Sequence, residues 1–464
     1  MTSSEPTADL LPSTRRALLH RVAVAQAEGR SPSLVGAVMR DGQLVWSGAR
    51  SCVEGHEPDE DTQFRIGSIT KSFTAVAVMR LRNEGLLDLA DPLKKHLPGR
   101  SELGAVGEVT IAQLLGHSAG LAAETPGAWW ERSSSTLRPG LAEVLGERPS
   151  PHLAGHRHHY SNPGYTLLGA VVETLRDAPW ADVVRREICV PLGMNRTDAQ
   201  PQPPHAGGWA VHPWADVILP EPSENLGVMA AAGQLWSTAG DLCRFAAFLA
   251  EGDDRVLGAE TVCDMRAPAA PPEAGDWEGG YGLGLQLARR DGRTLVGHTG
   301  SLPGFLAGLW LSVEDGVAGV ALANATSGPA TGAVAADLVR IVADAEPRMP
   351  QPWRPAPTVD TALLELTGPW YWGTTVVGLR LAADGDVEFG PLAGAGRRSR
   401  FRAEGDGTWT GLDGYYAGER LRVVRRDGVV SHLDLGSFVF TRGPYEPSAA
   451  VPGGVDEGGW RGLS

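Results

Sequence analysis

The hydrophobic and polar positions change their periodicity along the chain, and this change divides it into two parts. In the first part, residues 32–46 alternate around an Asp-Gly pair, which predicts a β-hairpin. A helix is expected to begin near Ser68, because apolar residues recur on one side of it at Ile69, Phe73, Val76 and Met79. Further helical patterns cover residues 110–116, 163–176, 181–190 and 238–250, and strand patterns cover residues 283–287, 294–296, 305–313 and 317–324. Strands at both ends and helices between them predict an α+β domain with an antiparallel sheet.

The second part follows a proline-rich stretch. Residues 346–357 contain five prolines, a composition typical of a semi-rigid linker. Beyond it, short alternating segments are separated by Asp-Gly pairs at 384–385, 406–407, 413–414 and 427–428, as hairpins require. This pattern predicts a small all-β domain, a barrel or a closed meander. We therefore expect a catalytic domain at residues 1–345, a linker at 346–359 and a β domain with an irregular tail at 360–464.

Composition and charge narrow the classes of partner. The 464 residues are 42% hydrophobic and 21% charged, as in globular proteins, and the net charge of −14 argues against nucleic-acid or anionic-membrane partners. The N-terminus lacks a basic segment followed by an apolar run, and no apolar stretch is long enough to span a bilayer, which predicts a cytoplasmic protein. The four cysteines are scattered without CxxC pairs. We expect no disulfide framework, no metal and no cofactor.

Lysine is scarce, which draws attention to one position. Of 41 basic residues, only Lys71, Lys94 and Lys95 are lysines. Lys71 follows Ser68 by three positions, so both side chains lie on one face of the expected helix. A serine hydroxyl is a poor nucleophile until a base removes its proton, and a lysine with a lowered pKa can be that base, whereas arginine cannot.

Two further motifs complete a candidate constellation. Tyr160-Ser161-Asn162 lies in a turn before a helix. A tyrosine beside a cationic lysine can hold a lowered pKa and relay protons. Asn162 offers an amide that can orient Lys71 and the substrate. The third motif, Gly-His-Thr-Gly-Ser at 297–301, lies on an expected strand. The backbone N–H groups of Ser68 and Ser301 can form an oxyanion hole there.

Together these motifs resemble the SxxK, YxN and [KH]TG motifs of the class C β-lactamase and D,D-carboxypeptidase superfamily. The resemblance covers about residues 15–345 and includes residues 86–93, 111–121, 191–194 and 236–242. It implies a class C β-lactamase-like domain in which Ser68 is the nucleophile and Lys71 the base. It further implies roles for other residues: Tyr160 as acid/base relay, Asn162 as orienter, His298 as a catalytic-site residue, and Thr299 and Gly300 as substrate contacts. His298 stands where many β-lactamases have lysine, which resembles the D,D-peptidases and D-aminopeptidases instead.

The two-domain layout is similar to that of penicillin-binding-protein-type thioesterases, whose second domain is lipocalin-like. This resemblance implies a non-ribosomal peptidyl thioester as substrate, a peptidyl carrier protein as the partner that delivers it, and release by head-to-tail cyclisation to a macrolactam. The alternatives are a D-stereospecific peptidase (a D,D-carboxypeptidase or D-aminopeptidase), a β-lactamase-like esterase or lactonase, and a non-enzymatic β-lactam sensor.

Other residues have competing interpretations. His152, His156, His158 and His159 lie in one loop, but no carboxylate or cysteine stands at ligand spacing, so a metal site is not favoured. Arg442 in the β domain can reach a substrate carboxylate or form a structural salt bridge. The tryptophans at 129–130 and 370–372 favour core or rim positions over a substrate platform.

Overall fold

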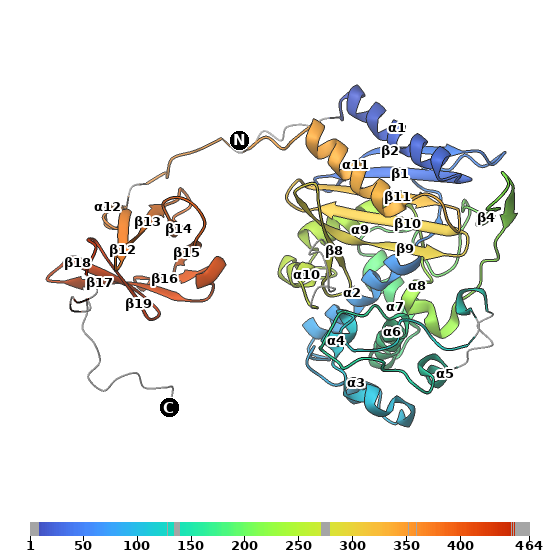
Figure 1. The fold of residues 1–464 in the computed structure, drawn as a ribbon, viewed down its shortest axis with the longest axis horizontal. Coiled ribbons are helices and arrows are strands. Elements are labelled where there is room, and N and C mark those ends of the chain that lie inside the picture. The colour runs from blue at the N-terminus through green and yellow to red at the C-terminus, as the bar shows by residue number, and fades with distance from the viewer. Residues whose placement is uncertain are drawn as a thin grey trace. The chain divides into compact units, whose positions relative to one another are not determined.

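The computed structural model describes residues 9–127, 129–133, 140–270, 279–350, 352–358, 360–446, 448 and 450. The chain divides into two compact units, Met1–Arg348 and Met349–Ser464, which are described separately (Figure 1). The expected linker, residues 346–359, contains this division, and the tail beyond residue 450 lies outside the described residues. Among the helices in the described ranges, none is both long and apolar enough to cross a membrane.

The first unit is built on a seven-stranded antiparallel sheet with the order β2-β1-β11-β10-β9-β8-β7. The N-terminal hairpin joins the C-terminal strands because β1 pairs with β11 from Leu34↔Ala323 to Arg40↔Val317. This arrangement confirms the predicted α+β architecture. The strands are β1 (Ser33–Arg40), β2 (Gln43–Ser51), β7 (Gly279–Tyr281), β8 (Gln286–Arg290), β9 (Arg293–Leu302), β10 (Phe305–Ser312) and β11 (Val317–Ala323). Two small pairs stand apart, β3 (Phe64–Arg65) with β6 (Trp236–Ser237) and β4 (Trp209–Val211) with β5 (Ile218–Pro220).

Helices cover both faces of this sheet (Figure 1). One hydrophobic cluster lies between the sheet and helices α1 and α11, and a larger one lies on the other face, where α2, α6 and α9 pack. The helices of this unit are α1 (Pro12–Glu28), α2 (Thr70–Asn83), α3 (Leu93–His96), α4 (Ile111–Leu115), α5 (Leu141–Leu145), α6 (Asn162–Arg176), α7 (Trp180–Val184), α8 (Ala230–Gly233), α9 (Ala239–Glu251), α10 (Ala259–Arg266) and α11 (Thr331–Ala345). Short 3₁₀ segments are η1 (Gly67–Ile69), η2 (Ser101–Glu108), η3 (Trp130–Arg132) and η6 (Gly227–Met229), and η5 (Arg185–Cys189) is a π-helical turn.

The second unit is a closed barrel in which eight strands pair in sequence order. The barrel closes where Tyr371 on the first strand pairs with Thr441 on the last. Its interior is filled by aromatic and aliphatic side chains from every strand, among them Trp370, Phe389 and Phe401, which are at most 1% exposed. The elements are α12 (Thr361–Leu364), β12 (Gly368–Trp372), β13 (Thr375–Leu381), β14 (Val387–Pro391), β15 (Ser399–Ala403), β16 (Thr408–Gly411), η7 (Gly414–Tyr416), β17 (Arg420–Arg426), β18 (Val429–Leu435) and β19 (Phe438–Thr441).

Asp-Gly pairs form three of the seven connections between successive strands of this barrel. The pairs at 384–385, 406–407 and 427–428 connect β13 to β14, β15 to β16 and β17 to β18. The pair at 413–414 differs, because Gly414 begins η7 instead of a hairpin turn. An all-β second domain, predicted from this pattern, is confirmed.

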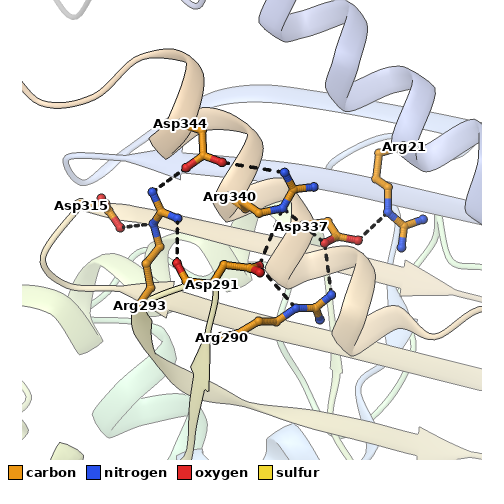
Figure 2. Close-up of polar contacts among 8 residues, drawn as sticks. All are labelled: Arg21, Arg290, Asp291, Arg293, Asp315, Asp337, Arg340 and Asp344. Atoms are coloured by element: carbon orange, nitrogen blue, oxygen red, sulfur yellow. Dashed lines mark hydrogen bonds and ion pairs between the residues drawn. The ribbon is translucent and has the colours of Figure 1, made fainter. Parts of the chain in front are cut away.

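A network of arginines and aspartates fastens the β8–β9 hairpin to α11 and α1 (Figure 2). Asp337 on α11 accepts from Arg21 of α1 at 2.8 Å and from Arg290 of β8 at 3.2 Å. Arg293 on β9 bridges Asp315 at 3.0 Å and Asp344 at 2.7 Å. Because β9 also carries residues 297–301, this network helps to fix the strand that borders the candidate site.

We expect Asp337→Asn to lower the free energy of unfolding of the first unit by about 1–2 kcal/mol, since it weakens three ion pairs, with Arg21, Arg290 and Arg340, in a network whose central carboxylate is mostly buried. Urea unfolding followed by helical circular dichroism, at low and at 1 M salt, measures the change. Asp216→Asn is the matched control, because Asp216 pairs with Arg30 while 95% exposed, and we expect a change below about 0.5 kcal/mol. Equal losses for the two variants would contradict a special role of the network.

Candidate active site

Ser68 and Lys71 meet at the beginning of α2. Ser68 lies in η1, directly before the helix, and Lys71 is the second residue of α2. The Lys71 Nζ donates to the Ser68 Oγ at 3.0 Å and to the backbone carbonyl of Ala232 at 2.7 Å. The predicted spacing therefore brings amine and hydroxyl into contact.

Burial gives Lys71 the properties of a base. The side chain is fully buried, and this burial lowers its pKa to about 7, although the nearby carboxylates of Glu124 and Glu131 oppose the shift. A neutral lysine with its lone pair directed at a serine hydroxyl can remove that proton. Arginine would stay charged in the same place.

Hydrogen bonds from α2 hold the Ala232 carbonyl in reach of Lys71. The Thr74 hydroxyl donates to the carbonyl of Ala231 at 2.8 Å, and the Thr70 hydroxyl accepts from the Leu235 N–H at 3.1 Å. Both threonines are completely buried. The polar side chains of this apolar helix thus bind the segment around α8, which in turn supplies an acceptor for Lys71.

Tyr160 lies over the other side of the lysine. Lys71 Nζ is 4.8 Å from the centre of the Tyr160 ring, and the Tyr160 hydroxyl is buried without a well-formed hydrogen bond to any described residue. Burial raises the pKa of Tyr160 above its usual value, and the nearby Ser68 hydroxyl only partly offsets this. The expected lowered pKa is therefore wrong: desolvation outweighs the lysine charge, and the phenol is neutral.

Asn162 contacts a different partner from the one expected. It begins α6, whose N-cap is Ser161, and its Nδ2 donates to Glu124 Oε1 at 2.8 Å. The other Glu124 oxygen accepts from the indole of Trp130 at 2.7 Å. The described contacts of Lys71 do not include the Asn162 amide, so Ala232, and not Asn162, is the second partner that orients the lysine.

His298 is buried with both ring nitrogens engaged. Its Nδ1 donates to the Thr299 carbonyl at 2.6 Å, so its Nε2 accepts from the Tyr281 hydroxyl at 3.0 Å. Burial, together with the charge of Lys71, lowers the pKa of His298 to about 3. His298 is therefore a neutral group at the wall of the site, and it is not a cation.

Two glycines allow β9 to approach Ser68. A Cβ at Gly300 would lie 2.0 Å from the Ile66 carbonyl oxygen, and one at Gly67, whose φ is 50°, would lie 2.6 Å from the Ser301 nitrogen. Only glycine fits such an approach. The backbone nitrogens of Ser68 and Ser301 consequently lie on adjoining segments, as an oxyanion hole requires.

A cleft of about 470 Å³ opens beside these groups. Its lining includes most of the site residues predicted in the first unit, together with the N-terminus of α11. Its lining residues are Ser68, Tyr160, Gln286, His298, Thr299, Gly300, Ser301, Leu306, Ala307, Pro329, Ala330, Thr331 and Gly332. No residue in this described lining carries a full charge at neutral pH.

The remaining candidates lie elsewhere or act differently. Arg442 belongs to the second unit, where its guanidinium donates to the carbonyls of Glu365, Thr367 and Pro369 and stacks 4.0 Å over the Trp370 ring. Arg442 therefore has a structural role, which it performs through backbone carbonyls and not through the salt bridge expected as one alternative from the sequence. In the histidine loop, the described residues contain no group of three or more His, Cys, Asp or Glu that could hold a metal ion. Trp130 and Trp370 are buried, whereas Trp129 is exposed.

Sequence reasoning missed several residues of the site. Gln286 accepts from the Thr299 N–H at 3.0 Å, and Tyr281 binds His298; neither stands in a motif. Ala232 acts through its carbonyl, which leaves no trace in side-chain patterns. Glu124 did offer a signal in the sequence, because it is a lone carboxylate in an apolar stretch. It follows the segment His-Ser-Ala-Gly-Leu at residues 117–121 by three positions.

Each of the two units matches a known family. A family model described as Beta-lactamase matches residues 18–344, and a domain of unknown function (DUF7586) matches residues 359–442. The chain is 28% identical to "Penicillin-binding protein 4" of Amycolatopsis lactamdurans over 318 residues, 64% of this chain and 82% of that protein. It spans 47% and 56% of two other curated relatives.

Two solved structures share the fold. That of SurE is 25% identical with a TM-score of 0.58, and the match covers 93% of this chain and 99% of SurE. A D-stereospecific amidohydrolase from Streptomyces sp. is 25% identical with a TM-score of 0.59 and covers 72% of this chain and 99% of its own. The match to SurE thus extends into the second unit.

We expect the rate of Ser68 acylation by a p-nitrophenyl ester to rise with pH through about 7, because Lys71 must lose its proton to act as a base and its pKa is about 7. Lys71→Arg should lower this rate by about 10²–10⁴ and remove the limb near pH 7. Stopped-flow release of p-nitrophenol measures both. Lys94→Arg, at an exposed lysine paired with Glu108, is the matched control. An unchanged pH limb in Lys71→Arg would assign the base to another group.

Proposed function

The chain belongs to the β-lactamase family, and from this we propose that it is a serine acyltransferase or hydrolase that acts on D-configured acyl donors without a charge at the leaving-group end. Ser68 is the nucleophile, Lys71 the base and Tyr160 the neutral phenol that completes proton transfer. A chain of this family whose first unit holds these three groups in contact has what acyl transfer needs.

The proposed reaction passes through an acyl-enzyme. Neutral Lys71 removes the Ser68 proton while Oγ attacks the substrate carbonyl, and the oxyanion is bound by the N–H groups of Ser68 and Ser301. The carbon–leaving-group bond then breaks; the leaving group takes a proton from the Tyr160 phenol, which regains one from the Lys71 ammonium. Water or an amine attacks the ester by the reverse sequence, and Ser68 is released.

The absence of a cation in the described lining of the cleft supports this choice of substrate class. An enzyme that binds a free carboxylate beside its nucleophile needs a cation there. The described lining of the cleft has none, and His298, at the position of the family's lysine, is uncharged with both nitrogens engaged. Peptide amides, esters and thioesters therefore fit better than β-lactams or peptides that end in a free carboxylate.

Acidic residues near the lysine support the same choice. Glu124 and Glu131 lie within electrostatic reach of Lys71. Their charge repels a substrate carboxylate and attracts an approaching amine. An amine is the nucleophile that aminolysis of the acyl-enzyme requires.

Within this class, the specific activity we propose is release of a non-ribosomal peptide thioester, delivered by a carrier protein, by head-to-tail cyclisation. A peptide amine tethered to its own acyl-enzyme has a high effective concentration and competes with water. The second candidate is hydrolysis of D-amino-acid amides, which the Streptomyces relative favours because it is named a D-stereospecific amidohydrolase.

We expect acetyl-D-alanyl-D-alaninamide to be cleaved with a kcat/KM about tenfold or more above that of acetyl-D-alanyl-D-alanine, because the two differ only in the terminal charge and tenfold corresponds to about 1.4 kcal/mol. Chromatographic assay of the released alanine or alaninamide measures the ratio. His298→Lys adds a cation at the cleft wall and should lower this ratio of kcat/KM values. A preference for the free carboxylate in the unaltered enzyme would contradict the proposal.

For the specific activity, we expect a linear peptide thioester with a D-residue at its acyl end to give a product lighter than the linear acid by one water, as a macrolactam is. The L-epimer should react at least tenfold more slowly. Mass spectrometry of the products, with Ser68→Ala as the inactive control, tests both expectations. The linear acid alone would favour the hydrolytic candidate, and a product that persists in Ser68→Ala would remove the nucleophile from its role.

A further inference from the structure

His117 is a buried histidine in the first unit that none of the three motifs contains. It is 1% exposed, and its φ of 55° places the backbone in the left-handed region. Residues other than glycine adopt this conformation rarely, and it persists only where the surrounding structure holds it. The position therefore needs an explanation beyond core packing.

The backbone around His117 is paired with the segment that carries Tyr160. Hydrogen bonds join residues 117–123 to residues 155–162 on both sides of the tyrosine. They run from Gly155 N to the Ser118 carbonyl (2.7 Å), from His159 N to the His117 carbonyl (2.7 Å), from Ser161 Oγ to the Ala122 carbonyl (2.7 Å) and from Asn162 N to the Ala123 carbonyl (2.9 Å). The pairing fixes the residues that flank Tyr160 in the sequence.

The side chain of His117 completes this pairing at one point. The Ser161 N–H, which lies between the two candidate site residues, donates to His117 Nδ1 at 3.0 Å. This bond is buried, so its loss would leave an unpaired N–H and free the backbone next to Tyr160. The bond also fixes the tautomer: Nδ1 accepts, and a neutral ring then carries its proton on Nε2.

The ring of His117 also supports the ring of Tyr160 directly. The two centres are 4.2 Å apart with an angle of 35° between the planes. Tyr281, the partner of His298, stands edge-on to the same imidazole at 4.6 Å. The imidazole thus contacts both Tyr160 and the tyrosine that binds His298.

We propose that His117 is a positioning residue for acylation of Ser68: its Nδ1 holds the Ser161 N–H and its ring backs the Tyr160 ring, so that the phenol stays beside Ser68 and Lys71. This inference rests on the proposed function of Ser68. His117 touches no reacting atom and acts through Tyr160. Burial, with further lowering from Lys71 and the neighbouring histidines, holds the pKa of His117 well below its usual value, which keeps Nδ1 free to accept.

Three substitutions separate the contributions of His117. Asparagine tolerates the left-handed backbone and can present an oxygen near the place of Nδ1. Glycine tolerates the backbone but removes both acceptor and ring. Phenylalanine keeps a ring and removes the acceptor.

We expect His117→Gly and His117→Phe to lower the single-turnover acylation rate of Ser68 by the p-nitrophenyl ester of acetyl-D-alanine about 10- to 100-fold, with little change in KM, because a small displacement of a catalytic group has effects of this size. His117→Asn should recover most of the rate. Thermal unfolding of each variant identifies the folded ones, and rates are compared among these. Equal rates in all variants, or an equal loss in His117→Asn and His117→Gly, would overturn the proposal.

A second measurement does not depend on activity. We expect amide hydrogen exchange at Ser161 to accelerate in His117→Gly and His117→Phe but not in His117→Asn, and histidine ¹⁵N spectra of the unaltered protein to show His117 neutral with its proton on Nε2. Unchanged exchange, or a proton on Nδ1, would overturn the proposal even if acylation slows. Absence of Ser68-dependent acylation in the unaltered protein would instead contradict the proposed function, and the exchange data would still decide the hydrogen bond.

Discussion

The complete burial of Lys71 is the constraint on which the rest of the site depends. A lysine in water holds its proton at neutral pH and cannot act as a base, whereas the apolar surroundings of α2 bring its pKa to about 7. A buried amine also needs hydrogen-bond partners, since leaving one unpaired costs about 1–3 kcal/mol. Ser68 Oγ and the Ala232 carbonyl meet that need. The requirement that stabilises the lysine thus also directs it at the serine.

The hydrogen bonds that the buried Lys71 requires link distant parts of the chain. Ala232 is held by contacts of its neighbours with Thr70 and Thr74, which makes α2 and the α8 segment one unit. On the other side, β9 approaches Ser68 through two glycines, and the ion pairs of Arg293 fix the same strand to α11 and the β10–β11 turn. Elements more than 150 residues apart in sequence therefore meet at one hydroxyl.

The sequence predicted much of this arrangement, because residues of a motif that lies on one helix or strand have the spacing that this element dictates. The Ser68–Lys71 contact follows from helical spacing, and the β domain follows from its alternation and Asp-Gly pairs. Helices α1 and α11 were not predicted. Helix α1 has almost no amphipathic pattern, whereas α11 is as amphipathic as α6 and α9, so its periodicity was a signal that was missed. A different limit applies to Ala232, whose carbonyl is an acceptor that every residue possesses. Asn162 was assigned to Lys71, but Glu124, which no motif marks, takes its amide.

One cause explains why the expected pKa of Tyr160 was wrong while that of Lys71 was right. Desolvation disfavours every charged form, so it lowers the pKa of Lys71 and His298 and raises that of Tyr160. The attraction between a lysine cation and a tyrosinate can dominate only if both are charged, and burial removes that premise for the tyrosine. Tyr160 and His298 are therefore neutral at pH 7, and a large share of Lys71 is neutral as well. New charge appears at the reacting atoms as the substrate carbonyl becomes an oxyanion, which is where fixed N–H donors contribute most to catalysis.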